Sequence, residues 1–501
     1  MNASFPVDNV ILVAAALLGL GVIVDLAANR VRVSGLLALM ALGMVIADDG
    51  LALIRFDDVA LAQNIAVVAL AVILFEGGLG TTFADAKPVL GPAGMLGTVG
   101  VFVTAAVVGG VCDLVLGLPT NTAWLLGAVV ASTDAASVFG ALRGQPIPRR
   151  AKQLLQLESG GNDPVAVMMT VGIVEAWRSG AQIGDWVSFG AIQLGGGLLV
   201  GALVGEFVRR TDDKLRISSA STSAVLALSA GGVAYGLAAS IGASGFLAVY
   251  VAGIFIAHEE RMVRPLRAFH ESLATTAQAG LFLILGMLVF PSELPAVFGK
   301  AVVVTLVLLL LARPAAVLVC LPWFGFRPRE MTLVAWAGLR GAVPIVLATV
   351  PLTAGHPDGV LVFEVVFVVV IVSLLLQATT VSAVARRLGL LEEETTTTFA
   401  DVLPVESSQA NVAELHLQPG AAVIGHRLAQ APLPADARVA IMRRDGAAFS
   451  PTGATELLAG DVLMIVIPPG SEVSDFVDWA SQPPQPPSPP QPPSPPSIDG
   501  R

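Results

Sequence analysis

The chain has 501 residues, of which 55% are hydrophobic and only 13% are charged, and its mean hydropathy is +0.78. Soluble globular domains carry roughly 25% charged residues, so this composition excludes an ordinary soluble domain. The net charge of −10 offers no basic surface, and we expect no nucleic-acid partner.

Thirteen segments of the chain are apolar enough to cross a lipid bilayer, which takes about 20 residues per helix. They are centred near residues 18, 40, 70, 104, 131, 164, 197, 230, 249, 283, 311, 340 and 372. The N-terminal "MNASFPVDNV" has neither a basic region nor a small-residue cleavage site, so we expect the first segment to be a retained helix. The sequence therefore predicts an all-α polytopic membrane protein.

The basic residues alternate between two sets of connecting loops. One set holds 18 of them: Arg30, Arg32, Lys87, Arg143, Arg149, Arg150, Lys152, Arg209, Arg210, Lys214, Arg216, Arg261, Arg264, Arg267, Arg327, Arg329, Arg386 and Arg387. The other set holds only Arg55, Arg178 and Lys300. Because basic loops stay in the cytoplasm, we expect the N-terminus outside and the C-terminus inside, in a bacterial cytoplasmic (inner) membrane.

Four of the apolar segments contain polar residues that lipid would reject. The third ends in "LFEGGLG" with Glu76, and the fifth contains "STDAAS" with Thr133 and Asp134. The sixth contains "ESGGNDP", and the twelfth contains "GLRGAVP" with Arg340. We expect the stretch at Thr133 to be unwound, so that its carbonyl faces an ion. Together these residues predict an ion site within the membrane.

The sixth segment carries five polar or helix-breaking residues within seven positions: Glu158, Ser159, Asn162, Asp163 and Pro164. If it is helical up to Pro164, Ser159 and Asp163 share one face, whereas Glu158 and Asn162 share the neighbouring face. Proline has no N–H and clashes with the preceding turn, which predicts a break in this helix. Carbonyls freed at mid-membrane need a partner, and a dehydrated monovalent cation is one.

The charges of the site suggest a mechanism. Arg340 cannot lose its proton, so it should be paired with a carboxylate, and Glu158 is the predicted partner because it points away from the Asp163 face. Asp163 is then the acid that titrates, since burial disfavours its charged form. A proton and a cation would compete for it, which is exchange. Because Asn162 stands where a second acid would be, a one-for-one, electrically silent cycle is expected.

Other residues that attract notice have simpler interpretations. Arg313 is interpreted as a residue that reaches the membrane surface or an interface. His258 and His270 are interpreted as solvated loop residues rather than pH sensors. Cys112 and Cys320 lie in apolar segments and are interpreted as small packing residues without a disulfide.

The amino-acid composition and the hydrophobic pattern change after the last predicted membrane span. We expect a transmembrane domain at residues 1–390, a polar linker at 391–410, a small α+β cytoplasmic module at 411–480, and a disordered proline-rich tail at 481–501. In the module, "VAELHL", "ARVAIMRRDG" and "DVLMIVIPP" are predicted strands and "PGAAVIGHRLAQ" a short helix. This order resembles the TrkA-C or RCK-C domain, which implies regulation by a small ligand of unidentified chemistry. No G-x-G-x-x-G motif follows a strand, and we expect no cofactor.

The motifs "FEGGL", "STDAAS", "ESGGNDP" and "GLRGAVP", in this order over some 390 residues, resemble those of the NhaP-type cation:proton antiporters. The run "GMLVFPSEL" resembles the corresponding run in one subgroup of these antiporters. Members of this subgroup carry a TrkA-C module and exchange potassium for protons. The resemblance implies about thirteen helices in two inverted repeats with broken helices, a homodimer, and a core bundle that moves like an elevator. The spacing of "ILFEGGL" from "LILGMLV" and of "STDAAS" from "GLRGAV" is compatible with the repeats.

The resemblance also implies roles for individual residues. Asp163 would be the essential acid that binds the cation and the proton, and Asn162 would hold the broken helix beside Pro164. The other residues implied to bind the cation are Asp134, Thr133, Ser159 and Glu76, and the implied stabilising pair is Glu158 with Arg340. No departure from the family pattern is seen at these positions.

Three alternatives remain open at this level. The first is an antiporter for sodium, or for both ions. The second is a channel gated by the RCK-like module, because "GTVGVF" at residues 97–102 resembles a potassium filter, although it lies inside an uninterrupted apolar segment. The third is a membrane receptor that does not transport. No nucleophile with an adjacent base and no phosphate-binding loop is found, so we predict a secondary transporter rather than an enzyme.

Overall fold

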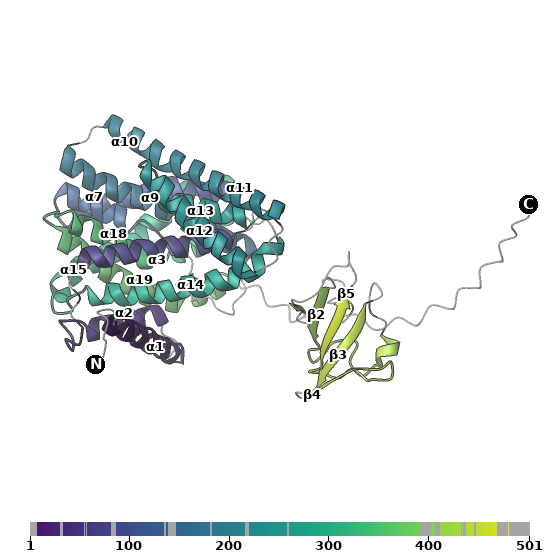
Figure 1. The fold of residues 1–501 in the computed structure, drawn as a ribbon. Helices are drawn as coiled ribbons and strands as arrows, with labels where there is room; N and C mark the ends of the chain where they lie inside the picture. The colour runs from purple at the N-terminus through teal and green to yellow at the C-terminus, as the bar shows by residue number, and fades with distance from the viewer. Residues whose placement is uncertain are drawn as a thin grey trace, which may run out of the picture. The chain divides into compact units, whose positions relative to one another are not determined.

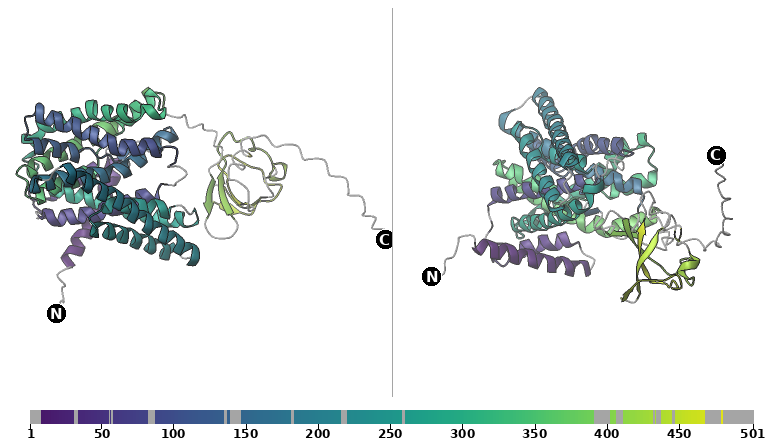
Figure 2. Two further views of the ribbon diagram at one scale, coloured as in Figure 1. Left: turned by 90° about the horizontal axis from the view of Figure 1, so that it is seen from above. Right: turned by 45° about the vertical axis from the view of Figure 1, so that its right-hand side comes forward.

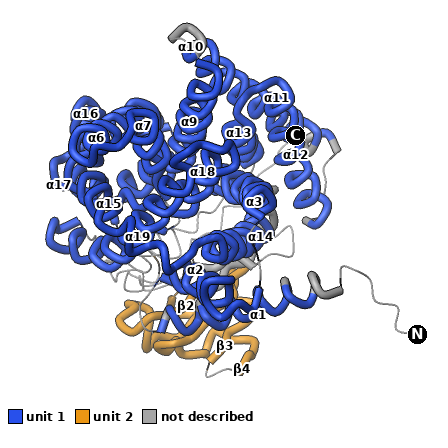
Figure 3. The backbone as a smooth tube through the Cα atoms, turned by 90° about the vertical axis from the view of Figure 1, so that its left-hand side faces the viewer, with its two compact units in different colours: residues 1–391 blue, residues 392–501 orange. Residues whose placement is uncertain are grey.

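A computed structural model of the chain divides into two compact units, residues 1–391 and residues 392–501 (Figure 3). The structure describes residues 8–479 apart from 31–33, 55, 57, 82–86, 135–136, 139–146, 181–182, 216–219, 258–259, 391–401, 406–410, 432, 434–436, 445–446 and 468–478. The predicted proline-rich tail, most of the predicted linker and His258 therefore lie outside the described residues.

All of the regular elements that the structure describes in the first unit are helices. They are α1 (Asp8–Arg30), α2 (Gly35–Ile46), α3 (Val59–Leu79), α5 (Leu90–Met95), α6 (Val101–Leu114), α7 (Thr120–Val129), α9 (Arg149–Ser179), α10 (Ile183–Ala191), α11 (Gly197–Leu215), α12 (Ala220–Ser240), α13 (Gly245–Ile256), α14 (Glu260–Met287), α15 (Leu294–Val307), α16 (Arg313–Cys320), α17 (Pro328–Trp336), α18 (Ala342–Thr353) and α19 (Gly359–Arg387). Short π-helical turns join α5 to α6, α10 to α11 and α15 to α16.

Many of these helices suit a bilayer by length and composition. Within the described residues, six helical runs are long and apolar enough to cross a membrane, and four more are apolar but shorter. Leucine and phenylalanine side chains point outward, such as Leu203 at 62% and Phe207 at 69% exposure on α11. Apolar surface of this extent fits a lipid environment. The predicted total of thirteen spans stays a prediction.

The helices of the first unit form two groups. Figure 3 looks along the bundle, with α6, α7, α15, α16, α17 and α19 on one side and α3, α11, α12, α13 and α14 on the other. The groups meet where α18 packs on α3 and α14 and where α9 packs on α13 and α3. The N-terminal pair α1 and α2, purple in Figures 1 and 2, lies at one edge, with α2 packed on α14.

Glycines let the helices of the second group approach closely. A Cβ added to Gly286 of α14 would lie 2.3 Å from a backbone oxygen of α2, and one added to Gly78 of α3 would lie 2.3 Å from a backbone oxygen of α13. The facing positions are also glycines, Gly43 and Gly253 respectively. Small residues at such crossings are the usual basis of tight helix packing in membranes. The same kind of glycine contact thus occurs at two helix crossings. Gly78 of one crossing and Gly286 of the other are 208 positions apart in the sequence.

Two further features also occur twice. A π-helical turn at Leu96–Gly100 continues α5 into α6, and another at Leu308–Ala312 continues α15 into α16. The chain also leaves the helical conformation after α7 and again between α17 and α18. The first π-helical turn overlaps the "GTVGVF" motif, which lies in one apolar helical run, Leu90–Leu114. This motif is therefore not a re-entrant filter loop.

The second unit contains a five-stranded antiparallel sheet in the order β1-β2-β5-β3-β4. Its strands are β1 (Val402–Val405), β2 (Asn411–His416), β3 (Arg438–Arg444), β4 (Ala447–Phe449) and β5 (Val462–Ile467). The three predicted strands are present as β2, β3 and β5. One sheet face covers a small core that includes Leu415, Leu463 and Ile465.

The structure of this unit differs from the expectation in two places. The predicted short helix is a series of turns that ends in one 3-10 turn, Leu428–Gln430, because Gly425, at φ +81°, lies in its middle. The strand β1 lies within the predicted linker. It was missed because Pro404 is at its centre, and proline is tolerated only in edge strands.

Candidate ion-binding site

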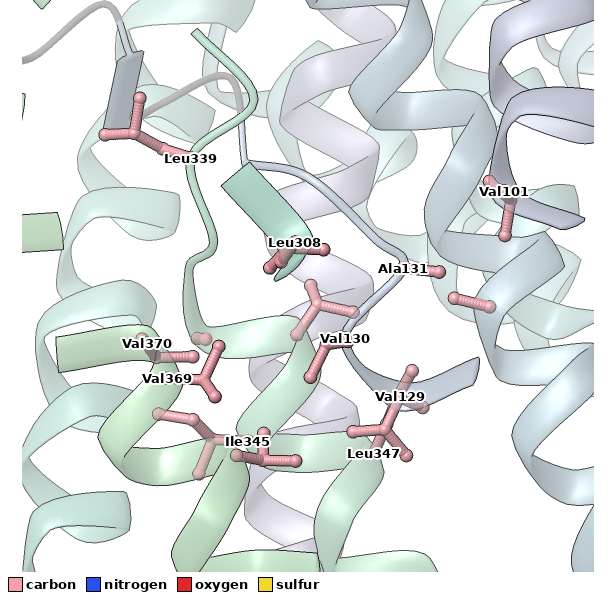
Figure 4. Close-up of a cluster of buried hydrophobic side chains, with 14 of the residues drawn as sticks. Val101, Val129, Val130, Ala131, Leu308, Leu339, Ile345, Leu347, Val369 and Val370 are labelled. Atoms are coloured by element: carbon pink, nitrogen blue, oxygen red, sulfur yellow. The ribbon is translucent and has the colours of Figure 1, made fainter. Parts of the chain in front are cut away.

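Two non-helical stretches of backbone meet inside the first unit. One follows α7, which ends at Val129, and the other joins α17 to α18. The backbone N–H of Asp134 donates to the carbonyl of Leu339 at 2.9 Å, which links the two stretches. Figure 4 shows the residues around them, with Val130 and Ala131 on the first stretch and Leu339 on the second. Backbone that leaves the helix in a membrane must find other partners, and such stretches are often functional.

The helix α9 supplies partners to the first stretch. Asn162 accepts the backbone N–H of Thr133 at 3.3 Å and donates its amide to the Thr133 hydroxyl at 2.5 Å. The hydroxyl of Ser159 donates to the Thr133 carbonyl at 2.8 Å. Every polar group of Thr133 is thereby bonded to α9. Its carbonyl, which was predicted to face an ion, accepts the Ser159 hydroxyl, and its role as an ion ligand stays a prediction.

The helix break predicted at Pro164 is wrong. The helix α9 is continuous from Arg149 to Ser179, with the proline inside it. A single proline removes only one helical hydrogen bond, and the neighbouring Gly160 and Gly161 have no side chains to add to the crowding. Asn162 therefore holds the interrupted fifth segment rather than its own helix.

Asp163 lies one helical turn from Ser159 and is 4% exposed. Its Oδ1 has no hydrogen-bond donor among the described residues. The charged groups that act on it are Asp134 and Arg340. A buried carboxylate oxygen without a donor is costly unless a positive species approaches it.

Asp134 is held in place at the crossing of the two stretches. Its Oδ2 accepts the Ser137 hydroxyl at 2.6 Å. A Cβ added to Gly341 would lie 2.0 Å from the same oxygen, so only glycine leaves room for this carboxylate. The second stretch therefore presents bare backbone to Asp134.

Glu158 is paired with Arg313, and not with Arg340 as predicted. Both guanidinium Nη atoms donate to the two carboxylate oxygens, one of them at 2.8 Å, and the side chains are 1% and 4% exposed. Arg313 is thus a buried structural residue rather than one that reaches the membrane surface. The pairing depends on the approach of α16 to α9, which the sequence does not encode locally.

Arg340 is fully buried in the second stretch. Its backbone N–H donates to the Ser373 hydroxyl at 3.3 Å. Its guanidinium nitrogens have no hydrogen-bond partner within the described part of the chain. The charges that act on it include Glu158 and Asp163. Arg340 therefore supplies a buried positive charge that acts on Asp163.

Glu76 is half-buried near the end of α3. No hydrogen bond joins its carboxylate to Asp163 among the described residues, and its charged neighbours are Arg267 and Glu271 of α14. Arg267 also donates to the Leu79 carbonyl at 3.0 Å, which caps α3. The role of Glu76 as a cation ligand remains a prediction.

Two residues near the site were missed or misjudged from the sequence. The ring of Tyr250 in α13 lies against Gly160, where an added Cβ would be 2.2 Å from it, and its side chain is buried. The chain has only two tyrosines, which is a signal that was available. His270, expected in a solvated loop, is fully buried between the rings of Phe75 and Phe269.

Comparison with known proteins gives two matches to family models. Residues 12–387 match the model described as sodium/hydrogen exchanger, transmembrane, and residues 412–477 match the TrkA-C domain. The curated protein named K(+)/H(+) antiporter NhaP2, from Shewanella sp. strain ANA-3, is 33% identical over 473 residues, which is 92% of this chain and 81% of that protein.

Among further relatives, one is named for potassium and another for sodium. The K(+)/H(+) antiporter NhaP of Alkalimonas amylolytica is 36% identical and covers 77% of this chain and 67% of its own length. The Na(+)/H(+) antiporter NhaH of Halobacillus dabanensis is 28% identical and covers 56% of this chain and 71% of its own length. The solved sodium proton antiporter MjNhaP1 of Methanocaldococcus jannaschii matches with a TM-score of 0.67 at 22% identity, over 76% of this chain and 99% of that one. The structural match shows a shared fold.

Proposed function

The chain belongs to the sodium/hydrogen exchanger family, and we propose that it exchanges potassium for protons at the cluster around Asp163. As a member of this family it is a multi-pass membrane protein and a secondary transporter that exchanges a monovalent cation for protons. The cation, the stoichiometry and the transport movement belong to the proposal.

One observation supports the choice of Asp163 above the others. Its Oδ1 is buried and has no hydrogen-bond donor among the described residues. A proton or a monovalent cation would provide the missing positive partner, and both would use the same oxygen. They exclude each other, so each direction of transport carries one species in turn. Asp134, Thr133 and Ser159 complete the proposed cation site, directly or through water.

The charges of the cluster support a one-for-one, electrically silent cycle. Asp134 and Asp163 bring two negative charges when ionised, and Arg340 brings one positive charge. The Glu158 and Arg313 pair is neutral as a whole. One proton or one monovalent cation would therefore neutralise the cluster, and the loaded site would cross the membrane with the same charge in both directions.

Potassium is proposed as the cation on the strength of the relatives. The two relatives that are 33% and 36% identical are named potassium/proton antiporters, and the former extends over 92% of this chain. A relative named for sodium is 28% identical over a shorter part. Sodium is therefore the alternative that the experiment below must separate.

The two groups of helices support an elevator movement. Asp134, Asp163 and Arg340 belong to the group with α7, α9 and α17, whereas Tyr250 belongs to the group with α3 and α13. We propose that the first group carries the site and slides against the second, which forms a homodimer. The repeated glycine contacts, π-helical turns and helix breaks support two inverted repeats.

The membrane orientation is also part of the proposal. The basic loops support an N-terminus outside and a C-terminus in the cytoplasm of a bacterial inner membrane. The TrkA-C domain at residues 412–477 would then lie in the cytoplasm and regulate transport in response to a small ligand.

The proposal can be tested in proteoliposomes that contain a pH-sensitive dye. Potassium added to one side should dissipate an imposed pH gradient, and collapsing the voltage with an ionophore should not change the rate. Asp163→Asn should reduce the exchange to the level of empty vesicles, because the amide can bind neither a proton nor a cation in this way. Asp113→Asn, at the end of α6, serves as the control and should retain exchange.

Three outcomes would contradict the proposal. Exchange with sodium alone would remove potassium as the cation. Full activity of the Asp163→Asn variant would remove Asp163 from its role. A current without proton movement would indicate a channel.

A further inference from the structure

The break between α17 and α18 leaves backbone groups that the helices cannot satisfy. In a membrane interior each of these groups requires another partner, because no bulk water is available. Some are satisfied by elements already described: Asp134 donates to the Leu339 carbonyl at 2.9 Å, and Arg313 donates to the Val334 carbonyl at 3.3 Å. Further partners come from α19.

Two fully buried polar side chains of α19, Ser373 and Gln377, face the break. The Gln377 amide donates to the carbonyl of Trp336 at 2.6 Å, and the Arg340 N–H donates to the Ser373 hydroxyl at 3.3 Å. The Ser373 hydroxyl in turn donates to the Gln377 Oε1 at 2.5 Å. The two side chains are four residues apart, so they share one face of the helix.

These bonds form one directed chain that starts and ends in the break. It runs from the Arg340 N–H through the Ser373 hydroxyl and the Gln377 amide to the Trp336 carbonyl. The direction is fixed at each step, because a hydroxyl has one proton to donate and an amide has one oxygen to accept it. The indole of Trp336 adds a bond to the Thr380 hydroxyl at 3.0 Å. Both sides of the break are therefore fastened to α19.

The break is also the wall of the proposed ion site. Arg340 precedes Gly341, whose bare backbone lies against the Asp134 carboxylate. A shift of this backbone would move the Arg340 charge and the surface that Asp134 rests on. Neither Ser373 nor Gln377 is among the residues that form the cation site, so their effect would be indirect.

We propose that Gln377, with Ser373, is a positioning residue of the transporter, which holds the break between α17 and α18 in the shape that binds the cation. This inference rests on the proposed function, because it concerns the affinity of the same site. Sites held by fully bonded buried networks lose their geometry when one member is removed.

The test compares Gln377→Leu with Thr379→Val in proteoliposomes, with potassium as the varied cation. The leucine has a similar size but leaves the Trp336 carbonyl without its donor. Thr379 is exposed on the same helix, and among the described residues its hydroxyl bonds to two carbonyls of its own helix, Leu375 and Leu376. We expect the KM for potassium to rise about tenfold in Gln377→Leu, as for a lost buried hydrogen bond, with a smaller change in maximal rate. Thr379→Val should keep the wild-type KM.

A second variant gives a readout that a loss of folding cannot mimic. Gln377→Glu can replace the amide donor only while its carboxyl is protonated, since an ionised carboxylate has no proton to offer Trp336. The ratio of its KM to that of the wild type should therefore stay near one at low pH and increase as the pH is raised. Ser373→Ala offers a milder disruption of the same chain.

The possible outcomes separate this inference from the proposed function. If the wild type exchanges neither potassium nor sodium for protons, the proposed function is wrong. If the wild type is active and Gln377→Leu retains its KM, the positioning role is wrong. The same conclusion holds if Gln377→Leu only reduces the amount of folded protein, or if the KM ratio of Gln377→Glu does not depend on pH.

Discussion

At the scale of single residues, the two buried arginines of the first unit have different surroundings. Arg313 makes a two-pronged ion pair with Glu158, and both are nearly inaccessible. Arg340 is fully buried and has no hydrogen-bond partner for its guanidinium among the described residues. The first arrangement fixes α16 to α9, and the second leaves a positive charge free to act on Asp163. We interpret the first as structural and the second as part of the site.

This interpretation predicts the effect of breaking the buried pair. Glu158→Gln leaves the Arg313 charge without a counter-charge, and removal of one partner of a buried pair costs about 3–5 kcal/mol. The double variant Glu158→Leu with Arg313→Met should lose less, because it removes both charges of the pair and leaves neither without its partner. Thermal unfolding of the purified protein in detergent measures both. Glu206→Gln, in a partly exposed pair with Arg209, is the control and should have little effect, because solvent screens the charges of such a pair. Equal losses in the single and double variants would contradict the structural role.

His356 predicts a pH dependence of stability outside the membrane spans. It lies in the connection between α18 and α19, where its ring centroid is 4.8 Å from that of Trp177 and its Nδ1 accepts the Asp358 backbone N–H at 3.2 Å. Burial lowers the pKa of His356, although the nearby Asp358 opposes this. The folded state thus favours the neutral ring. Its contribution to stability is present above the unfolded pKa of about 6.5 and is lost as the pH falls through the lower folded pKa.

The corresponding experiment follows the melting temperature between about pH 5 and pH 8. The wild type should lose stability toward low pH, and His356→Gln should lose less, because it has no proton to bind. His426→Gln changes an exposed histidine of the second unit and should follow the wild type. Identical pH profiles for the wild type and His356→Gln would show that this histidine does not contribute.

The residues of the site could be identified from the sequence, but the residues that they pair with could not. Thr133, Ser159, Asn162 and Asp163 stand out because polar residues are expensive in an apolar segment, and the structure brings them together. The partner of Glu158 could not be predicted, because two arginines lie in apolar segments and only the helix packing decides between them. The sequence identifies groups that need partners, and the tertiary structure assigns the partners.

At the scale of the elements, backbone contact through glycine determines how α2, α3, α13 and α14 pack. Gly78 and Gly286 each face a backbone oxygen that an added Cβ would approach to 2.3 Å. Backbone cannot move aside as a side chain can, so the helices would have to separate. The locations of these crossings could not be predicted, because glycines are frequent along the whole chain and most of their patterns look alike.

A prediction follows for substitution of these glycines. Gly78→Ala and Gly286→Ala should each lower the free energy of unfolding by about 1–3 kcal/mol, the cost of overpacking. Gly280→Ala is the matched control in α14, because nothing lies within 4 Å of its added Cβ. It should be neutral or slightly stabilising, since alanine favours a helix. Thermal unfolding in detergent measures all three, and a tolerated Gly286→Ala would contradict the close approach.

The interruptions of helices were predicted in part. Breaks were expected near Thr133 and Pro164, and the structure has the first but keeps the second helix intact. The other interruption, between α17 and α18, contains no proline and was not predicted. It is stabilised from outside by α19, α16 and the stretch at Asp134. Such a break depends on partners that are distant in sequence, so the local sequence does not predict it.

At the scale of the whole molecule, the second unit has a small core of its own. Its sheet was largely predictable from alternating apolar residues, whereas its edge strand β1 was not. The carboxylate of Asp461, which is fully buried, accepts bonds from the Arg444 guanidinium at 2.7 and 2.6 Å and from the Leu458 N–H at 2.8 Å. A domain of this size buries little apolar surface, so one such pair is a large part of its stability.

Separate cores imply that the second unit can unfold while the first continues to transport. Arg444→Leu leaves the buried Asp461 without its counter-charge, which should cost about 3 kcal/mol or more. We expect limited proteolysis to cut the second unit of this variant rapidly, while exchange of the monovalent cation for protons persists in proteoliposomes. Arg438→Leu, an exposed position in the same strand, should resist proteolysis like the wild type. If Arg444→Leu abolishes exchange itself, the second unit is required for transport rather than for its control, because the loss arises in a unit that contains none of the proposed ion ligands.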